Sequence, residues 1–166
     1  MPMFSAEPLQ RQGAFLVANV TGKVAARAKA VKILKKIPVL QGLLDEEYKM
    51  VLAMCSSTAA RKGDVLFKQG DDGSSMFILL SGEIDINVAA IGTVHVMKAG
   101  EILGEIGLVK KVPRTASAVI AQDSVLLQLY SEILHDVVKK HPRIGYIIMR
   151  NVARILAERL SETNRK

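Results

Sequence analysis

Glycines divide the middle of this chain into short apolar segments at nearly regular intervals. They stand at positions 63, 70, 73, 82, 92 and 100, and between them lie the apolar stretches 65–67, 76–80, 84–88 and 94–97. Along 84–88 apolar and polar residues alternate, which is the pattern of a strand with one buried face. Strands this short, separated by turns this regular, are typical of an antiparallel barrel or jelly roll. We therefore expect a mainly β fold whose barrel occupies residues 61–130.

One further strand pair is predicted to complete the barrel. Its strands are expected at Ala116–Ile120 and Val125–Tyr130, joined by a turn at residues 121–124. With 166 residues, 49% of them hydrophobic, the chain is long enough for one such domain with flanking helices. The single cysteine, Cys55, cannot form an internal disulfide, which favours a reducing, cytoplasmic setting. It ends an apolar stretch, so we expect a buried residue at a helix end.

Helices are predicted on both sides of the barrel. Residues 32–60 are expected to form an N-terminal helical segment, in which Asp45 caps the start of a helix. Residues 131–166 begin with a short helix from Ser131, and Pro142 separates it from a long amphipathic helix that reaches Thr163. The apolar stripe of the long helix needs a partner. The helix could fold over the barrel as a lid, or it could pair with its copy in a homodimer.

Residues 100–117 lie between predicted strands and gather glycines, one arginine and two hydroxyl side chains close to a glutamate. In Gly104-Glu105-Ile106-Gly107, the glycines let the backbone present N–H groups to an anion. Arg114 offers the planar fork of donors that matches phosphate geometry. A carboxylate repels phosphate, so Glu105 is better suited to accept hydrogen bonds from hydroxyls beside the phosphate, such as those of a ribose. The segment therefore predicts a site for a small phosphorylated sugar.

The run Gly100–Leu108, followed by Pro113–Ser117, closely resembles the phosphate-binding cassette of the cyclic nucleotide-binding domain family. The stretches 62–71 and 76–82 resemble the first half of the barrel in the same family, so the resemblance covers approximately residues 32–162. The family includes the bacterial catabolite activator, regulatory subunits of cyclic AMP-dependent kinase and cyclic nucleotide-gated channels. The resemblance implies an antiparallel jelly-roll barrel with N-terminal helices and a long C-terminal helix.

The resemblance also implies roles for individual residues. Glu105 would accept a hydrogen bond from the ribose 2′-OH, and Arg114 would pair with the equatorial phosphate oxygens. The other residues implied to contact the phosphate and ribose are Gly104, Ile106, Gly107, Thr115 and Ala116. The positions that would reach the base are Ile86, Val94, Thr163 and Asn164. For these four, ordinary packing of a strand or the solvated end of a helix would account for the same residues.

We interpret the chain as a sensor that binds a cyclic nucleotide, with cAMP favoured over cGMP because cAMP is the commoner ligand among bacterial-looking members. Thr115 leaves cGMP as an alternative ligand, since in relatives this position can contact the 2-amino group of a guanine.

Three scattered histidines and one cysteine offer no metal-ligand spacing, and no nucleophile motif is present, so we expect no enzyme, metal or cofactor. The alternatives are the sensor half of a longer transcription regulator and a scaffold with a vestigial pocket. Retention of both Glu105 and Arg114 favours ligand binding.

Charge is distributed unevenly along the chain. Residues 1–37 carry a net charge of +6, residues 38–138 carry −5 and residues 139–166 carry +6. Residues 1–31 are predicted to form a basic helical extension that could lie on an anionic membrane surface or contact an acidic partner, although a solvated helix face is the more usual reason for such a charge pattern. The chain ends at Lys166, before a helix-turn-helix domain could fit, so direct sequence-specific DNA binding is not expected.

Overall fold

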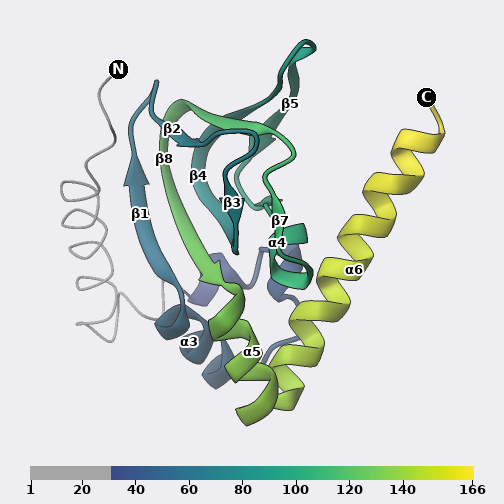
Figure 1. Ribbon diagram of the computed structural model, residues 1–166. Helices are drawn as coiled ribbons and strands as arrows, with labels where there is room; N and C mark the ends of the chain where they lie inside the picture. Colours follow the sequence, from purple (N-terminus) through teal and green to yellow (C-terminus); the bar gives the residue numbers. More distant parts are fainter. Residues whose placement is uncertain (1–30) are drawn as a thin grey trace.

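The computed structural model describes residues 31–166, so the predicted basic extension lies, except for its last residue, outside the described residues. Figure 1 shows the strands wrapped into a barrel, with helices gathered at one end and the long C-terminal helix standing beside it. The elements, in order, are η1 (Pro38–Leu40), α3 (Asp45–Met54), β1 (Ser56–Ala60), β2 (Val65–Phe67), β3 (Asp72–Gly73), β4 (Ser75–Val88), β5 (Gly92–Lys98), β6 (Ile102–Leu103), α4 (Ile106–Val109), β7 (Val112–Pro113), β8 (Ser117–Tyr130), α5 (Ser131–Lys140) and α6 (Pro142–Asn164).

The strands pair only in antiparallel fashion within the described part of the chain. A six-stranded sheet has the order β1-β8-β4-β5, with β2 also paired to β8 and β6 to β4, while β3 and β7 form a two-stranded sheet. The predicted mainly β architecture with flanking helices is confirmed.

The first strand begins earlier than the sequence pattern predicted. Residues 56–60 were expected to belong to the N-terminal helical segment, but they form β1, which pairs with residues 124–128 of β8. Their sequence, Ser-Ser-Thr-Ala-Ala, lacks the large apolar residues that mark a strand. Here pairing to a long neighbouring strand decides the conformation and overrides weak local preference.

The predicted turn at residues 121–124 is also corrected, because β8 runs through it as one strand. Gln122 and Asp123 are exposed on the outside of the barrel, where polar side chains are compatible with a strand. The Asp123 carboxylate accepts a hydrogen bond from the backbone N–H of Lys62 at 2.8 Å. Opposite them, the register of β4 shifts around Gly82, which has φ +94° and whose added Cβ would lie 2.2 Å from Ser124 Oγ. A bulge therefore bends two continuous strands where turn residues were expected to separate four short ones.

Helix α3 starts one residue from the position predicted. Leu44, not Asp45, occupies the position just before the helix and makes no capping hydrogen bond with its side chain, while the Glu47 carboxylate accepts the backbone N–H of Leu44 at 2.7 Å. Asp45 is the first helical residue and pairs instead with Lys35 at 2.6 Å. A carboxylate three residues into the helix thus satisfies the donor that precedes it.

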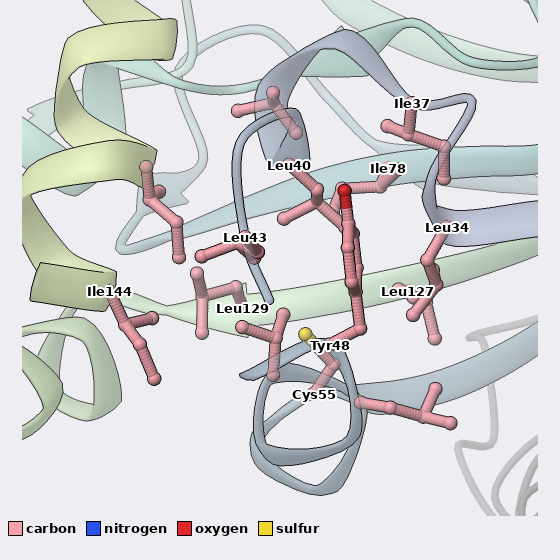
Figure 2. Close-up of a cluster of buried hydrophobic side chains, with 14 of the residues drawn as sticks. Leu34, Ile37, Leu40, Leu43, Tyr48, Cys55, Ile78, Leu127, Leu129 and Ile144 are labelled. Atoms are coloured by element: carbon pink, nitrogen blue, oxygen red, sulfur yellow. The ribbon is translucent and has the colours of Figure 1, made fainter. Parts of the chain in front are cut away.

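Two apolar clusters form the core. One cluster fills the barrel. The other joins the helices to the end of the barrel that they cover, and Figure 2 shows Tyr48 there among Leu34, Leu40 and Leu127. Cys55 lies at the end of α3 and is buried in the second cluster, as predicted; burial raises the pKa of its thiol to about 12. The thiol is therefore unreactive in the folded domain.

The break between α5 and α6 falls at His141-Pro142, as predicted, with proline tolerated in the first turn of α6. The two helices meet closely at Gly145, where an added Cβ would lie 2.5 Å from Val138 Cγ2. The apolar stripe of α6 is buried from Ile144 to Val152, whereas Leu160 is 62% exposed. No helix in residues 31–166 is long and apolar enough to cross a membrane.

Candidate functional site

Arg114 lies between β7 and β8 and is 8% exposed. Its guanidinium carbon lies 4.4 Å from the ring centroid of Phe67 and 5.7 Å from that of Phe77. Nη2 donates to Ser75 Oγ at 3.2 Å and Nη1 to the Gly104 carbonyl at 3.5 Å, a long contact. Nε is buried without a hydrogen-bond partner among the described residues. This arginine therefore keeps unused hydrogen-bonding capacity at a buried position, which normally has a functional reason.

Burial lowers the pKa of the Arg114 guanidinium from its ordinary value, while the nearby carboxylates of Asp72, Asp71 and Glu105 act in the opposite direction. The group stays charged at neutral pH, because an arginine starts from a pKa above about 12. A buried cation that is only partly compensated favours binding of an anion.

Two glycines allow the backbone to approach this arginine. Gly104 has φ +77°, and a Cβ there would lie 2.2 Å from Arg114 Nη1. Gly107 packs on β3, where a Cβ would lie 2.4 Å from the Gly73 carbonyl oxygen. Side chains at either position would push the cassette away from Arg114, so the glycines set the distance between the backbone and the cation.

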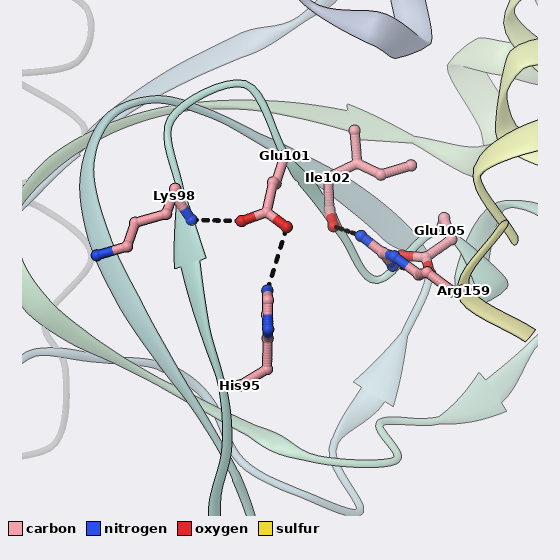
Figure 3. A network of polar contacts seen from close by, with 6 residues as sticks. All are labelled: His95, Lys98, Glu101, Ile102, Glu105 and Arg159. Carbon is pink, nitrogen blue, oxygen red and sulfur yellow. Dashed lines mark hydrogen bonds and ion pairs between the residues drawn. The ribbon is translucent and has the colours of Figure 1, made fainter. Parts of the chain in front are cut away.

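Glu105 is the second buried charge of the site. It immediately precedes α4 and is 6% exposed. Its Oε1 accepts a hydrogen bond from Arg159 Nη1 at 2.5 Å, and Arg159 Nη2 donates to the Ile102 carbonyl at 2.8 Å. Figure 3 shows Arg159 reaching from α6 to both acceptors, apart from the His95–Glu101–Lys98 contacts of the β5–β6 connection.

Arg159 was missed by the sequence reasoning. It lies four and three residues after Ile155 and Leu156, both on the predicted apolar stripe, so helical spacing places all three on one face. An arginine at the end of a stripe that faces a predicted carboxylate site was a usable indication.

A cavity of about 180 Å³ lies at Arg114 and Glu105. Every predicted phosphate and ribose residue lines it: Gly104, Glu105, Ile106, Gly107, Arg114, Thr115 and Ala116. Of the predicted base contacts, Ile86 lines the cavity, whereas Val94, Thr163 and Asn164 are not among its lining residues. Val94 is 48% exposed on β5, and the Thr163 hydroxyl donates to the Arg159 carbonyl at the exposed end of α6.

A larger hollow of about 670 Å³ lies between α4 and α5. Its charged lining residues are two lysines that follow α4 and two acidic residues of α5: Lys110, Lys111, Glu132 and Asp136. Because these side chains are exposed, and none is a buried unpaired cation, the smaller cavity is the better anion site.

The model of the cyclic nucleotide-binding domain family matches residues 58–141, slightly more than half of the chain. The chain belongs to this family. Its matched part runs from within β1 to the residue just before α6 and contains the whole cassette.

Individual relatives agree with this assignment. This cyclic nucleotide-binding domain is 30% identical over 135 residues to the cyclic AMP receptor protein of Thermus thermophilus, covering 79% of this chain and 61% of the relative. The structure of the Thermus thermophilus catabolite activator protein matches with a TM-score of 0.68 and 30% identity, over 76% of this chain and 60% of that one. A cyclic nucleotide-binding domain from Methylobacillus flagellatus has a TM-score of 0.72 at 24% identity, covering 81% and 78%, which supports the fold. The domain thus spans less than two thirds of the Thermus relatives.

Proposed function

We propose that this regulatory domain binds cAMP in the cavity beside Arg114 and Glu105. The observation that carries the proposal is the pairing of a buried, incompletely bonded arginine with a buried carboxylate in one small cavity. A cyclic phosphate and the ribose hydroxyl beside it require one cationic donor group and one acceptor at adjacent positions.

Each group of the ligand has a proposed partner. Arg114 binds the phosphate oxygens through the N–H donors along the edge of its planar guanidinium, and the backbone N–H groups of Thr115 and Ala116 complete that contact. Glu105 accepts the ribose 2′-OH, while the backbone of Gly104 and Gly107 lets the ligand approach closely. Ile86 is the proposed contact for the base, and Ile106 lines the ribose. Val94, Thr163 and Asn164 remain proposed base contacts that require the ligand to extend beyond the present cavity.

cAMP is the first candidate because the Thermus thermophilus relative is a cyclic AMP receptor protein. A structural neighbour at 23% identity, PfPKA-R, carries bound cAMP. Thr115 is exposed at the cavity, where its hydroxyl offers a partner for the amino group of a guanine, so cGMP is the second candidate.

We propose a role in signalling and not in catalysis, in a cytoplasmic setting. The residues that line the cavity, all in the described part of the chain, supply an anion site and an acceptor but no nucleophile paired with a base. Ligand binding would shift α6 between two packings because only one of them leaves room for a nucleotide; ligand pockets typically measure about 300–1,000 Å³. No separate cofactor is proposed.

A second candidate function is the sensor half of a longer transcription regulator. It is favoured by the Thermus thermophilus relative, of which the chain covers 61%. A homodimer through α6 is proposed with it, since Tyr146 is 65% and Leu160 62% exposed on that helix. An acidic partner or an anionic membrane remains the proposed contact for the basic residues 1–31.

Calorimetric titration of nucleotide-free protein with cAMP and cGMP tests the proposed site. Arg114→Gln removes the cation, and we expect the free energy of cAMP binding to weaken by about 2–3 kcal/mol, the value of a hydrogen bond to a charged group. Arg61→Gln, at an exposed position after β1, is the matched control and should leave affinity within about twofold.

A folded Arg114→Gln variant that binds as tightly as the wild type would place the phosphate elsewhere. Loss of binding in both variants would point to a general effect of removing positive charge. Thermal melting of each variant establishes that the comparison is made on folded protein.

A further inference from the structure

One charged contact joins the C-terminal helix to the cavity. Arg159 donates from Nη1 to Glu105 Oε1 at 2.5 Å and from Nη2 to the Ile102 carbonyl at 2.8 Å, and it lines the cavity itself. We infer that Arg159 is an internal competitor of the ligand: it occupies the carboxylate that the ribose hydroxyl needs, and the nucleotide binds by displacing it. This inference rests on the proposed function.

Glu105 and Arg159 are both held in the cavity, so the guanidinium and the ribose hydroxyl compete directly for the carboxylate. The Glu105 side chain is 8% exposed, so a hydroxyl can approach it only through the cavity in which Arg159 lies. The Ile102 carbonyl accepts a hydrogen bond from Arg159 Nη2, the second guanidinium nitrogen, and this contact fixes the side chain in that position. A cavity of about 180 Å³ is smaller than those that usually hold ligands of nucleotide size. Entry of the ligand therefore requires the guanidinium to leave.

Release of Arg159 would remove a contact that holds the C-terminal end of α6 to the barrel. Ile155 and Leu156 pack partly against the core, whereas every residue from Leu160 to Lys166 is exposed. Within residues 31–166, Arg159 is thus the last side chain of α6 that holds the helix to the barrel by a charged contact. Displacing it frees the final turns of α6 for a different packing, and occupancy of the cavity is converted into a change at the C-terminal end of the helix.

The competition makes a measurable difference to affinity. The Arg159 side chain is 40% exposed, so the pair is worth little more than a surface ion pair, and its loss should tighten cAMP binding by about fivefold. Arg159→Gln removes the charge and keeps a side chain of similar reach. Arg154→Gln, an exposed arginine on the same helix, is the matched control and should change affinity by less than about twofold.

The test is calorimetry of the full chain with cAMP at low and high salt, for wild type, Arg159→Gln, Arg154→Gln and each of these in a Glu105→Gln background. We expect the fivefold gain in Arg159→Gln to shrink toward one as salt rises, because the ion pair is screened. We also expect it to vanish in the Glu105→Gln background, where the carboxylate charge is already gone. Unchanged or weaker binding by Arg159→Gln would overturn the inference, as would a gain that persists without the Glu105 charge.

Hydrogen exchange without ligand supplies a readout independent of nucleotide binding. The amides of residues 155–164 should exchange faster in Arg159→Gln than in wild type and Arg154→Gln, because the end of α6 loses its tether. Equal exchange would overturn the inference even if the site binds cAMP. Absence of cAMP and cGMP binding in wild type and Arg159→Gln alike, with faster exchange in the variant, would instead refute the proposed function while leaving the tether in place.

Discussion

Gly104 offers the sharpest test of how the cassette positions Arg114. Its φ is +77°, and a Cβ there would lie 2.2 Å from Arg114 Nη1 and 3.0 Å from the Ser75 carbonyl oxygen. In Gly104→Ala the arginine must move, because the Ser75 carbonyl belongs to β4 and cannot give way easily. We therefore expect both a loss of stability and a loss of ligand affinity.

The magnitude follows from two contributions. An L-residue held at positive φ costs about 1–2 kcal/mol. Moving Arg114 off the ring of Phe67 loses about 1 kcal/mol of cation–π attraction, and its two long hydrogen bonds are worth about 0.5 kcal/mol each. The free energy of unfolding should thus fall by about 3–4 kcal/mol in Gly104→Ala.

Gly100→Ala separates the two contributions. Gly100 has φ +93°, and no atom of the described residues lies within 4 Å of an added Cβ, so its substitution should cost only the backbone strain of about 1–2 kcal/mol. Urea denaturation of both variants, with calorimetric titration of cAMP, measures the comparison. Equal losses of stability together with unchanged cAMP affinity in Gly104→Ala would refute the claim that this glycine sets the position of Arg114.

Two further predictions concern the helical end of the domain. Glu47 accepts the Leu44 N–H and pairs with Arg143 of α6; desolvation raises the pKa of its carboxyl, but the contacts with Arg143 and Leu44 outweigh this and leave the pKa lowered. Since the folded pKa lies below the unfolded value of about 4.3, the stabilisation is present above that pH and lost as pH falls through the folded pKa. Glu47→Gln should therefore destabilise the domain by about 1 kcal/mol at pH 7 and by less as the pH falls below about 4 in urea titrations, and a difference independent of pH would contradict this. Asn151 is buried in α6 and donates to the carbonyls of Val39 and Gln41 at 3.0 and 2.8 Å. Asn151→Leu leaves both acceptors unpaired and should cost about 1–3 kcal/mol in the same assay. Asn164→Leu, at the exposed end of the helix, should cost less than about 0.5 kcal/mol, and equal costs would refute the account.

The parts of the fold that the sequence predicts correctly depend on local pattern. The alternation at residues 84–88, the proline at the start of α6 and the glycines around Glu105 each specify a backbone conformation within a few residues. The cassette residues converge on one cavity because the glycines and Arg114 that form it lie close together in the chain.

The parts that local pattern predicts poorly depend on partners distant in the chain. β1 is a strand because it pairs with β8, some seventy positions later, and its own residues give little indication of it. Residues 122 and 123 resemble a turn only because they are polar, and the bulge at Gly82 that accommodates them lies on another strand. Arg159 contacts Glu105 across 54 positions, and the approach of α6 to the cassette is set by packing of Ile144 to Val152 much earlier in the helix.

A crystal structure of the domain with cAMP would test the central claim most directly. We predict the cyclic phosphate within hydrogen-bond distance of Arg114, the ribose 2′-OH on Glu105, and Arg159 moved off that carboxylate. A nucleotide bound in the hollow between α4 and α5, or one bound beside Arg114 while Arg159 stays on Glu105, would contradict the account.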